Sequence, residues 1–175
     1  MTGAADTSVH ATAVLVGNRA VLIRGPSGAG KSRLAFELVL AGRAGQIPPA
    51  VLVGDDRVHL QARGGHLVVR PAPHLAGLIE IRGLGIRCCE FADEAIVNLV
   101  VDLAATDGAR LPEAEALWTQ IHGVQIPRIP VAPGFEPLPM VAASIITTKS
   151  LDSLRLSPDC VKGIGNHIKA SIAPE

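Results

Sequence analysis

Short apolar runs separated by turn residues dominate the first half of the chain. Residues 13–16 and 20–24 flank Gly17 and Asn18, a pair typical of the tight turn of a β-hairpin. Residues 58–62 and 66–70 flank a turn with two glycines, and they predict a second hairpin. All four runs are rich in Val, Leu and Ile, which favour β-strands.

One segment has helical rather than strand periodicity. Within residues 31–41, Leu34, Leu38 and Ala41 recur at helical spacing, and Gly42 is expected to end the helix. Further strands are predicted at 50–54, 78–82 and 96–103, a short helix at 111–121 and an extended proline-rich segment at 126–139, whereas 141–148 fits either a strand or a helix. The order of strand, glycine-rich loop, helix and further strands is typical of an α/β domain with a mixed sheet.

This pattern divides the chain of 175 residues into three parts. Residues 1–9 are predicted to form a flexible arm, residues 10–148 one domain, and residues 149–175 a polar tail that is helical near its end. No apolar run reaches the roughly 20 residues of a membrane span, and residues 1–10 lack the apolar stretch of a signal peptide. We therefore expect a cytoplasmic protein that does not contact a membrane.

The composition narrows the class of protein further. Sixteen basic and sixteen acidic residues give a formal net charge of +0, which argues against a nucleic-acid binder with a broad basic face. A hydrophobic content of 48% excludes a disordered chain. Aromatic residues make up only 2%, so the core must be aliphatic. Cys88, Cys89 and Cys160 match no zinc spacing and are expected to be free thiols.

A glycine-rich loop carries the strongest chemical signal. It fits the pattern G-x-x-x-x-G-K-[ST] with Gly25, Pro26, Ser27, Gly28, Ala29, Gly30, Lys31 and Ser32. Glycine lets successive backbone N–H groups turn toward one phosphate, and the next helix directs its positive end to the same anion. Lys31 would add a charge for the β- and γ-phosphates and Ser32 a hydroxyl for Mg²⁺. The loop predicts nucleoside triphosphate binding but does not determine the fate of the γ-phosphate.

Enzymes with such a loop also need an acidic residue at the end of a strand, for Mg²⁺ or for the nucleophile. Asp55 and Asp56 follow the strand at 50–54, and Asp102 follows residues 96–101. Two adjacent carboxylates can divide the work, because one can hold metal-bound water while the other accepts a proton. We expect Asp55 and Asp56 to serve the site, with a solvated turn or helix cap as the alternative, and Asp102 to be structural.

Three other polar residues are weaker candidates. Glu80 and Arg82 lie two residues apart on a predicted strand, so they face the same side and fit either a metal–phosphate site or a surface ion pair. His10 stands just before the first strand. The remaining histidines have no metal-binding spacing and are expected on the surface.

Together these segments resemble the catalytic domain of the HPr kinase/phosphorylase family, bacterial P-loop enzymes that phosphorylate a serine of the phosphocarrier protein HPr. The resemblance rests on His10 ahead of the loop, on GPSGAGKS, on the double aspartate and above all on LIEIRGLGI at residues 78–86. It implies an α/β P-loop kinase domain of the HPr kinase type, with a mixed sheet and flanking helices. Family members carry a further N-terminal domain, whereas nine residues precede His10, so a short form is expected.

The resemblance implies a role for each matched residue that handles the nucleotide. Residues 25–32 would bind ATP, with Lys31 at the β- and γ-phosphates. Ser32 and Glu80 would hold Mg²⁺. The protein substrate implied is HPr or an HPr-like carrier, and the assembly implied is a homo-oligomer, because the family forms hexamers.

The resemblance also implies the groups that act on the acceptor. Asp56 would be the base that takes the serine proton, supported by Asp55. His10 would assist near the phosphate, and Arg82 would belong to the catalytic set.

The sequence departs from the family in two segments. The family pattern Pro-Val-Arg-Pro-Gly-Arg-Asn corresponds to residues 130–136, where Ala132 and Phe135 replace the two arginines. Two fewer cations near the phosphate predict that phosphorylase activity is weak or absent. The segment from Lys149 onward does not match the family helix expected there.

Two other functions fit the loop. One is a small-molecule kinase or a nucleotide-switch ATPase. The other is a non-catalytic nucleotide-binding sensor, whose partner would be a two-component regulator. A GTPase is disfavoured, since the chain has no N-K-x-D guanine motif.

Overall fold

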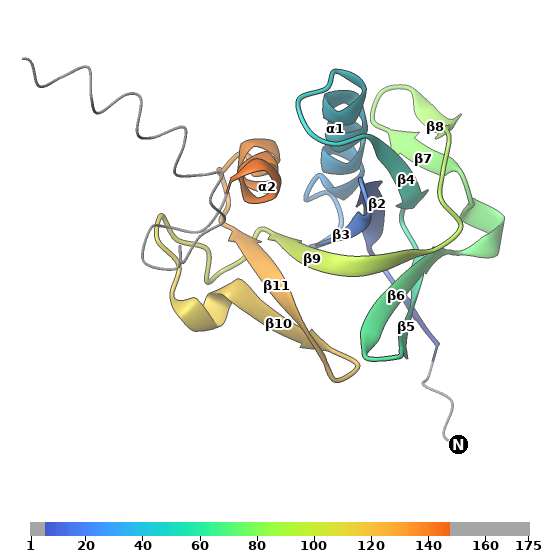
Figure 1. Cartoon of the computed structure of the whole chain (residues 1–175). Helices are drawn as coiled ribbons and strands as arrows, with labels where there is room; N and C mark the ends of the chain where they lie inside the picture. Colours follow the sequence, from blue (N-terminus) through green and yellow to red (C-terminus); the bar gives the residue numbers. More distant parts are fainter. Residues whose placement is uncertain (1–5, 148–175) are drawn as a thin grey trace, which may run out of the picture. The chain divides into compact units, whose positions relative to one another are not determined.

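The computed structural model describes residues 6–147, in which eleven strands and two α-helices are formed (Figure 1). The strands are β1 (Thr7–Val9), β2 (Thr12–Val16), β3 (Arg19–Arg24), β4 (Ala50–Gly54), β5 (Val58–Arg63), β6 (His66–Pro71), β7 (Leu78–Ile81), β8 (Gly85–Cys88), β9 (Ala95–Leu103), β10 (Trp118–Ile121) and β11 (Val124–Val131). The helices are α1 (Lys31–Arg43) and α2 (Pro137–Ile146), and two 3-10 turns lie at Pro73–Leu75 and Ala114–Leu117. Contacts group the described residues up to Ile145 into one compact unit.

The strands form a mixed sheet in the order β1-β5-β6-β9-β3-β2-β4, with β11 also paired to β9 and β10 paired to β11. β9 runs parallel to β3 and β11 and antiparallel to β6. The parallel pairs bring the carboxyl ends of β3, β9 and β11 to one edge, and the glycine-rich loop follows β3 at that edge. Ligands of open α/β sheets bind at such edges. β7 and β8 form a separate two-stranded sheet.

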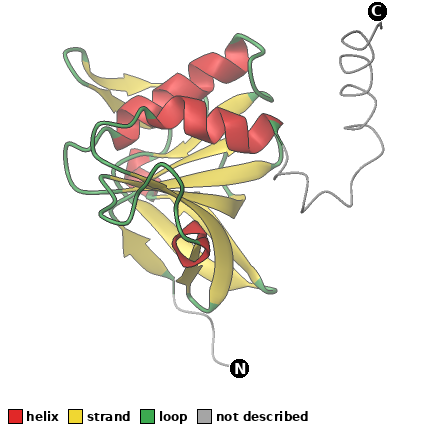
Figure 2. Cartoon of the chain, turned by 90° about the vertical axis from the view of Figure 1, so that its left-hand side faces the viewer, coloured by secondary structure: helices red, strands yellow, loops and turns green. Residues whose placement is uncertain are grey.

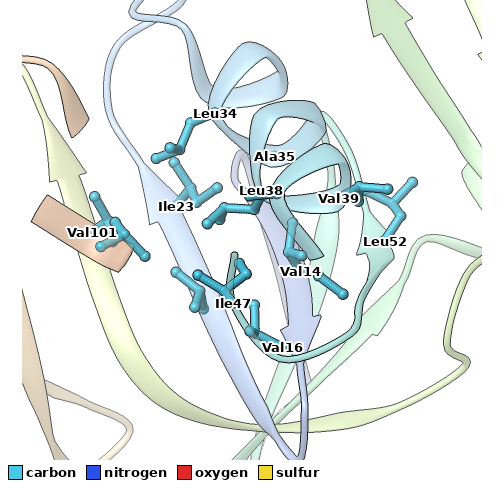
Figure 3. Packing of buried hydrophobic residues seen from close by; sticks show 14 of the residues in the cluster. Val14, Val16, Ile23, Leu34, Ala35, Leu38, Val39, Ile47, Leu52 and Val101 are labelled. Carbon is cyan, nitrogen blue, oxygen red and sulfur yellow. The ribbon is translucent and has the colours of Figure 1, made fainter. Parts of the chain in front are cut away.

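Alternating side chains give the sheet a core on each face. On β3, Val21 and Ile23 belong to the cluster that packs against α1, while Ala20 and Leu22 belong to the cluster on the other face. Figure 3 shows Leu34 and Leu38 of α1 over the first face, and Figure 2 shows the two helices together on one side of the strands. Every buried hydrophobic side chain in the described part is Ala, Val, Leu or Ile, which confirms the predicted aliphatic core.

α1 extends past the glycine that was expected to end it. The helix continues through Gly42 to Arg43. Gly42 packs so closely on β4 that a Cβ atom there would lie 2.6 Å from the backbone nitrogen of Ala50. The prediction that Gly42 ends the helix is therefore wrong, because this glycine serves close packing rather than termination.

Three other segments differ from the predicted pattern. Thr7–Val9 pairs with β5, so the flexible arm does not extend to residue 9. Trp118–Ile121 is a strand paired with β11, which leaves only Ala114–Leu117 helical in the expected helix at 111–121. α2 makes most of 141–148 helical and starts at Pro137, inside the segment expected to be extended. Proline suits the first turn of a helix, where its missing N–H would have no partner.

Two further findings concern membrane-spanning helices and the C-terminal segment. No helix among residues 6–147 is long and apolar enough to cross a membrane. The predicted tail at 149–175 and Cys160 lie outside the described residues.

Candidate active site

The glycine-rich loop joins β3 to α1 at the carboxyl edge of the sheet. Gly28 and Gly30 have φ angles of 79° and 97°, a left-handed conformation that favours glycine. Lys31 is only 6% exposed, and its Nζ donates hydrogen bonds to the backbone oxygens of Gly25 at 3.1 Å and Pro26 at 3.2 Å. The loop thus curves around the ammonium group, which places a fixed positive charge beneath it.

Asp55, at the end of β4, is the buried centre of the site. It is 4% exposed, and its carboxylate accepts hydrogen bonds from Thr12 Oγ1 at 2.7 Å, Ser32 Oγ at 2.8 Å and the backbone N–H of Glu80 at 3.1 Å. These donors come from β2, α1 and β7. A buried carboxylate is tolerated only when its oxygens are hydrogen-bonded, and all three donors are uncharged or backbone groups.

Asp56, the next residue, has the opposite environment. Its side chain is 69% exposed, and its Oδ1 lies 3.2 Å from Nε2 of His10. Its backbone has a φ of 62°, a left-handed conformation that Asp adopts more readily than most residues. The sharp turn separates the two carboxylates, so that one faces inward to Ser32 and the other faces solvent beside His10.

A cavity of about 640 Å³ opens above the loop. Its lining comprises His10, Ser27, Gly28, Ala29, Gly30, Lys31, Ser32, Arg33, Phe36, Glu37, Asp56, Glu80, Ile81 and Arg82. The predicted residues His10, Lys31, Asp56, Glu80 and Arg82 therefore share one cavity. Among the other predicted residues, Gly25, Pro26 and Asp55 do not line it.

Sequence reasoning missed several residues of this site. Thr12 was not predicted, although a polar residue at the start of an apolar strand is a usable signal. Arg33, Phe36 and Glu37 add a second turn of α1 to the cavity wall. Their i, i+3 and i+4 spacing places them on one face of the helix.

The loop that follows β11 reaches the same helix face. Arg33 donates hydrogen bonds to Glu37 at 2.7 Å and to Glu136 at 3.5 Å, and the hydrogen bond to Glu37 raises the pKa of Arg33. Glu136 belongs to residues 130–136, the segment in which Ala132 and Phe135 stand where the resemblance predicted arginines. This segment brings a carboxylate rather than a guanidinium to α1.

Asp102 lies at the same edge of the sheet but outside the cavity lining. Its carboxylate accepts two hydrogen bonds of 2.7 Å from Arg24 and a third from Arg128, which also holds Asp107. Burial would raise the pKa of Asp102, but the hydrogen bonds from both arginines outweigh burial and lower that pKa. Asp102 therefore links β9 to β3 and β11, as expected of a structural residue.

The other candidate ligands form no second site. Cys88 and Cys89 are free thiols as expected, and burial raises the pKa of Cys89. Within residues 6–147, no group of three or more His, Cys, Asp or Glu side chains could hold a metal ion.

Comparisons with known proteins find similarity over most of the chain. Residues 2–155 match the family model "HPr Serine kinase C-terminal domain". The HPr kinase/phosphorylase of Geobacillus thermodenitrificans is 36% identical over 144 residues, which are 75% of this chain and 44% of that protein. A Streptococcus thermophilus protein of the same name is 47% identical over 81 residues, which are 46% of this chain and 24% of that protein. The chain thus spans less than half the length of these curated relatives.

A solved structure shares the fold. The HPr(Ser) kinase/phosphatase from Coxiella burnetii aligns with a TM-score of 0.63 at 23% sequence identity, and the alignment covers 80% of this chain and 93% of that one. This similarity supports the mixed α/β fold.

Proposed function

Because the chain belongs to the HPr serine kinase C-terminal domain family, we propose that it transfers the γ-phosphoryl group of ATP to a serine of a phosphocarrier protein, HPr or an HPr-like relative. The observation that carries this proposal is the exposed Asp56–His10 pair on the rim of a cavity built on the glycine-rich loop. The pair provides a proton acceptor that a protein-borne hydroxyl can reach, and the loop provides a cradle for phosphate.

The loop and the first turn of α1 would hold the triphosphate. Backbone N–H groups at residues 27–32 would surround the phosphate oxygens, and the positive end of α1 would favour the same anion. Lys31 would offset charge at the β- and γ-phosphates. Transfer of a phosphoryl group has a loose transition state, so catalysis comes mainly from positioning and charge neutralisation.

The donor set near Ser32 fits Mg²⁺. This ion takes oxygen ligands and keeps several waters, so one or two protein oxygens suffice. Ser32 donates its hydroxyl hydrogen to Asp55, which leaves the Ser32 oxygen lone pairs available for a cation. Ser32 and Glu80 would hold the ion, with Asp55 behind them. When bound, Mg²⁺ would neutralise charge on the phosphate oxygens.

Asp56 would act as the general base. The serine proton passes to Asp56 while the serine oxygen bonds to the γ-phosphorus, and the bond from that phosphorus to the bridging oxygen breaks to release ADP. Asp55 is unsuited to this step, since it is buried and already accepts three hydrogen bonds. His10 would hold Asp56 toward the cavity, and Arg82 would add positive charge to the cavity lining.

Mass spectrometry of a carrier after incubation with ATP and Mg²⁺ tests the proposal. HPr should gain one phosphoryl group on a serine, and HPr with that serine replaced by Ala should gain none. ATP consumption without phosphoserine on any carrier would instead support a small-molecule kinase or an ATPase. ATP binding without any transfer would support a nucleotide sensor.

The reverse reaction should be slow. The segment at 130–136, which comprises the end of β11 and the loop after it, carries Ala132, Phe135 and Glu136 rather than cations. Inorganic phosphate and a phosphoprotein would therefore find less positive charge there. Serine-phosphorylated HPr incubated with inorganic phosphate should therefore release pyrophosphate far more slowly than the forward reaction consumes ATP. Similar rates in the two directions would refute this expectation. Ala132→Arg and Phe135→Arg should each raise the reverse rate.

A further inference from the structure

A positive side chain lies in the first turn of α1, where the helix itself does not favour one. Arg33 is the third residue of α1, and no acidic side chain lies in that turn. The amino end of a helix carries a partial positive charge, so a cation there is unfavourable and an anion is favourable. The side chain of Arg33 is 68% exposed, so it contributes little to the core. The position of Arg33 therefore suits a helix end that binds an anion.

The two carboxylates that contact Arg33 hold it weakly. Glu37 lies 2.7 Å away as an i, i+4 partner, but the cation precedes the acid, which is the less stabilising order in a helix. Glu136 lies 3.5 Å away, and its side chain is 69% exposed. Exposed ion pairs contribute little to stability, because water and salt screen them. A phosphate group with more than one negative charge can therefore displace Glu136 from the guanidinium.

Glu136 does not depend on Arg33 for a favourable environment. It directly precedes α2, which begins at Pro137, and the dipole of a helix stabilises a carboxylate at its amino end. Figure 2 shows α1 and α2 on the same side of the strands, and the hydrogen bond from Arg33 to Glu136 joins the starts of the two helices. Glu136 therefore has a stabilising position both with Arg33 and without it.

Arg33 also lies in the lining of the cavity, directly after Lys31 and Ser32. Side chains of a helix lean toward its amino end, so the guanidinium can reach back over the loop that would hold the phosphates. Lys31 and Ser32 are assigned to the β- and γ-phosphates and their Mg²⁺, so the next residue of α1 falls on the side of the α-phosphate. The segment at 130–136 carries no arginine, and Arg33 brings a mobile positive charge to the cavity from α1 instead.

We propose that Arg33 is a nucleotide-binding residue whose guanidinium leaves Glu136 and binds the α-phosphate when ATP or ADP enters the cavity, and that Glu136 is the carboxylate that competes with the nucleotide for it. This inference rests on the proposed function, because it adds a nucleotide contact to the site of that reaction. ATP and ADP share the α-phosphate, so Arg33 should contribute equally to the affinity for both and should not contribute to the transfer step.

Calorimetry of nucleotide binding with Mg²⁺ tests the contact without HPr. Arg33→Gln should weaken the binding of ATP and of ADP by the same factor, roughly tenfold, as expected for loss of a hydrogen bond to a charged group. Arg33→Lys keeps the charge and should weaken both less. Arg19→Gln is the matched control, because Arg19 is exposed, lies outside the cavity lining and should leave both affinities unchanged.

Three results would overturn this contact. Unchanged affinity in Arg33→Gln would show that Arg33 does not bind the nucleotide. A loss for ATP without a loss for ADP would place Arg33 at the γ-phosphate. An equal loss in Arg19→Gln would attribute the effect to the net charge of the protein.

Glu136→Gln tests the competing carboxylate. This variant should bind ATP and ADP a few-fold more tightly than wild type, because Arg33 no longer leaves a carboxylate to reach the phosphate. The same substitution in the Arg33→Gln variant should have no such effect, since no guanidinium remains to be released. A gain in affinity in both backgrounds would show that Glu136 only repels the phosphates, and no gain in either would show that it does not compete. Either result would refute the role of Glu136.

Steady-state kinetics with HPr separate this inference from the proposed function. Arg33→Gln should raise the KM for ATP and the Ki for ADP by the same factor and keep kcat within a few-fold of wild type, because the contact is the same before and after transfer. A large fall in kcat with unchanged nucleotide affinity would assign Arg33 to the transfer step and refute the inference. If wild type binds ATP but phosphorylates no carrier, the proposed function fails, and the calorimetry still decides the role of Arg33. If wild type phosphorylates HPr and Arg33→Gln binds nucleotide normally, only the inference fails.

Discussion

The aspartates that follow β4 and the aspartate near the end of β9 have similar places in the fold but different partners. Asp102 is held by the guanidinium groups of Arg24 and Arg128. Asp55 is held by two hydroxyls and a backbone N–H, while Asp56 pairs with His10 among the residues that the structure describes. The comparison shows that the partners of a carboxylate, more than its position in the sheet, decide what it can do.

The physical reason is the number and the charge of the hydrogen-bond donors that each carboxylate has. Two arginines lower the pKa of Asp102 and occupy its oxygens, so it is a poor proton acceptor and cannot approach a ligand. The uncharged donors on Asp55 leave its negative charge unpaired, which favours a nearby cation. Asp56 is exposed, with one imidazole nitrogen 3.2 Å from its Oδ1, and retains oxygen lone pairs for a substrate hydroxyl.

Asp56→Asn should have the largest effect on transfer. The amide cannot accept the serine proton, so the rate should fall by about 10²–10⁴-fold while ATP affinity stays within a few-fold of wild type. Asn also tolerates the left-handed backbone of Asp56, so the fold should be preserved. Single-turnover assays with HPr measure the transfer rate, and calorimetry measures the affinity for ATP. If Asp56→Asn transfers phosphate at the wild-type rate, Asp56 is no more a catalytic base than Asp102 is.

Asp55→Asn should have an intermediate effect on transfer, and this effect should appear as a need for more Mg²⁺. The amide group cannot accept hydrogen bonds at both of its ends, so either Ser32 or the Glu80 N–H loses its partner. Loss of such a supporting group typically weakens metal binding by about 10–100-fold. The Mg²⁺ concentration for half-maximal transfer should rise accordingly. Thr12→Val removes only one donor to Asp55 and should shift that concentration less. If wild type, Asp55→Asn and Thr12→Val all need the same Mg²⁺ concentration, Asp55 does not support the metal site.

Asp102→Asn should have the smallest effect on transfer and should act on stability. Removing this carboxylate leaves Arg24 without a carboxylate partner and Arg128 with Asp107 alone, which costs about 3 kcal/mol of unfolding free energy. The rate of the folded enzyme should stay within a few-fold of wild type. Urea unfolding and kinetics measure the two properties, with the exposed Asp107→Asn as a milder control. A large loss of kcat in folded Asp102→Asn would place Asp102 in the site.

The same variant predicts a pH dependence. The pKa of Asp102 is lower in the folded chain than in the unfolded chain, so its ionised form stabilises the fold above the ordinary aspartate value of about 4. This contribution is lost as pH falls through the lowered folded-state pKa. The difference in unfolding free energy between wild type and Asp102→Asn should therefore be constant at neutral pH and shrink below about pH 4.

Local signals predicted much of the fold. The turns at Gly17 and Gly64 correctly indicated two hairpins, and the spacing of Leu34 and Leu38 indicated α1. The pairing of β1 with β5 was missed, since it joins segments about fifty residues apart and no local pattern marks it. Sequence cannot show such a contact when the short strand is half exposed.

The candidate site was predicted as a set of residues but not as a geometry. The sequence predicted both Asp55 and Asp56 as site residues, because they follow a buried strand as a pair, and both lie at the candidate site. Their separation into a buried and an exposed carboxylate depends on the left-handed backbone of Asp56 and on Thr12 from a distant strand. The partners of Asp102 were equally hidden, because Arg24 and Arg128 lie on strands far away in the sequence.

The near absence of aromatic side chains has an experimental benefit. The chain contains one tryptophan and no tyrosine. Trp118 lies on β10, the strand that pairs with β11, which in turn pairs with β9. Its intrinsic fluorescence therefore reports on that single strand, which neighbours the Arg24–Asp102 cluster through Thr119. Emission spectra can follow the opening of this edge of the sheet without an added label.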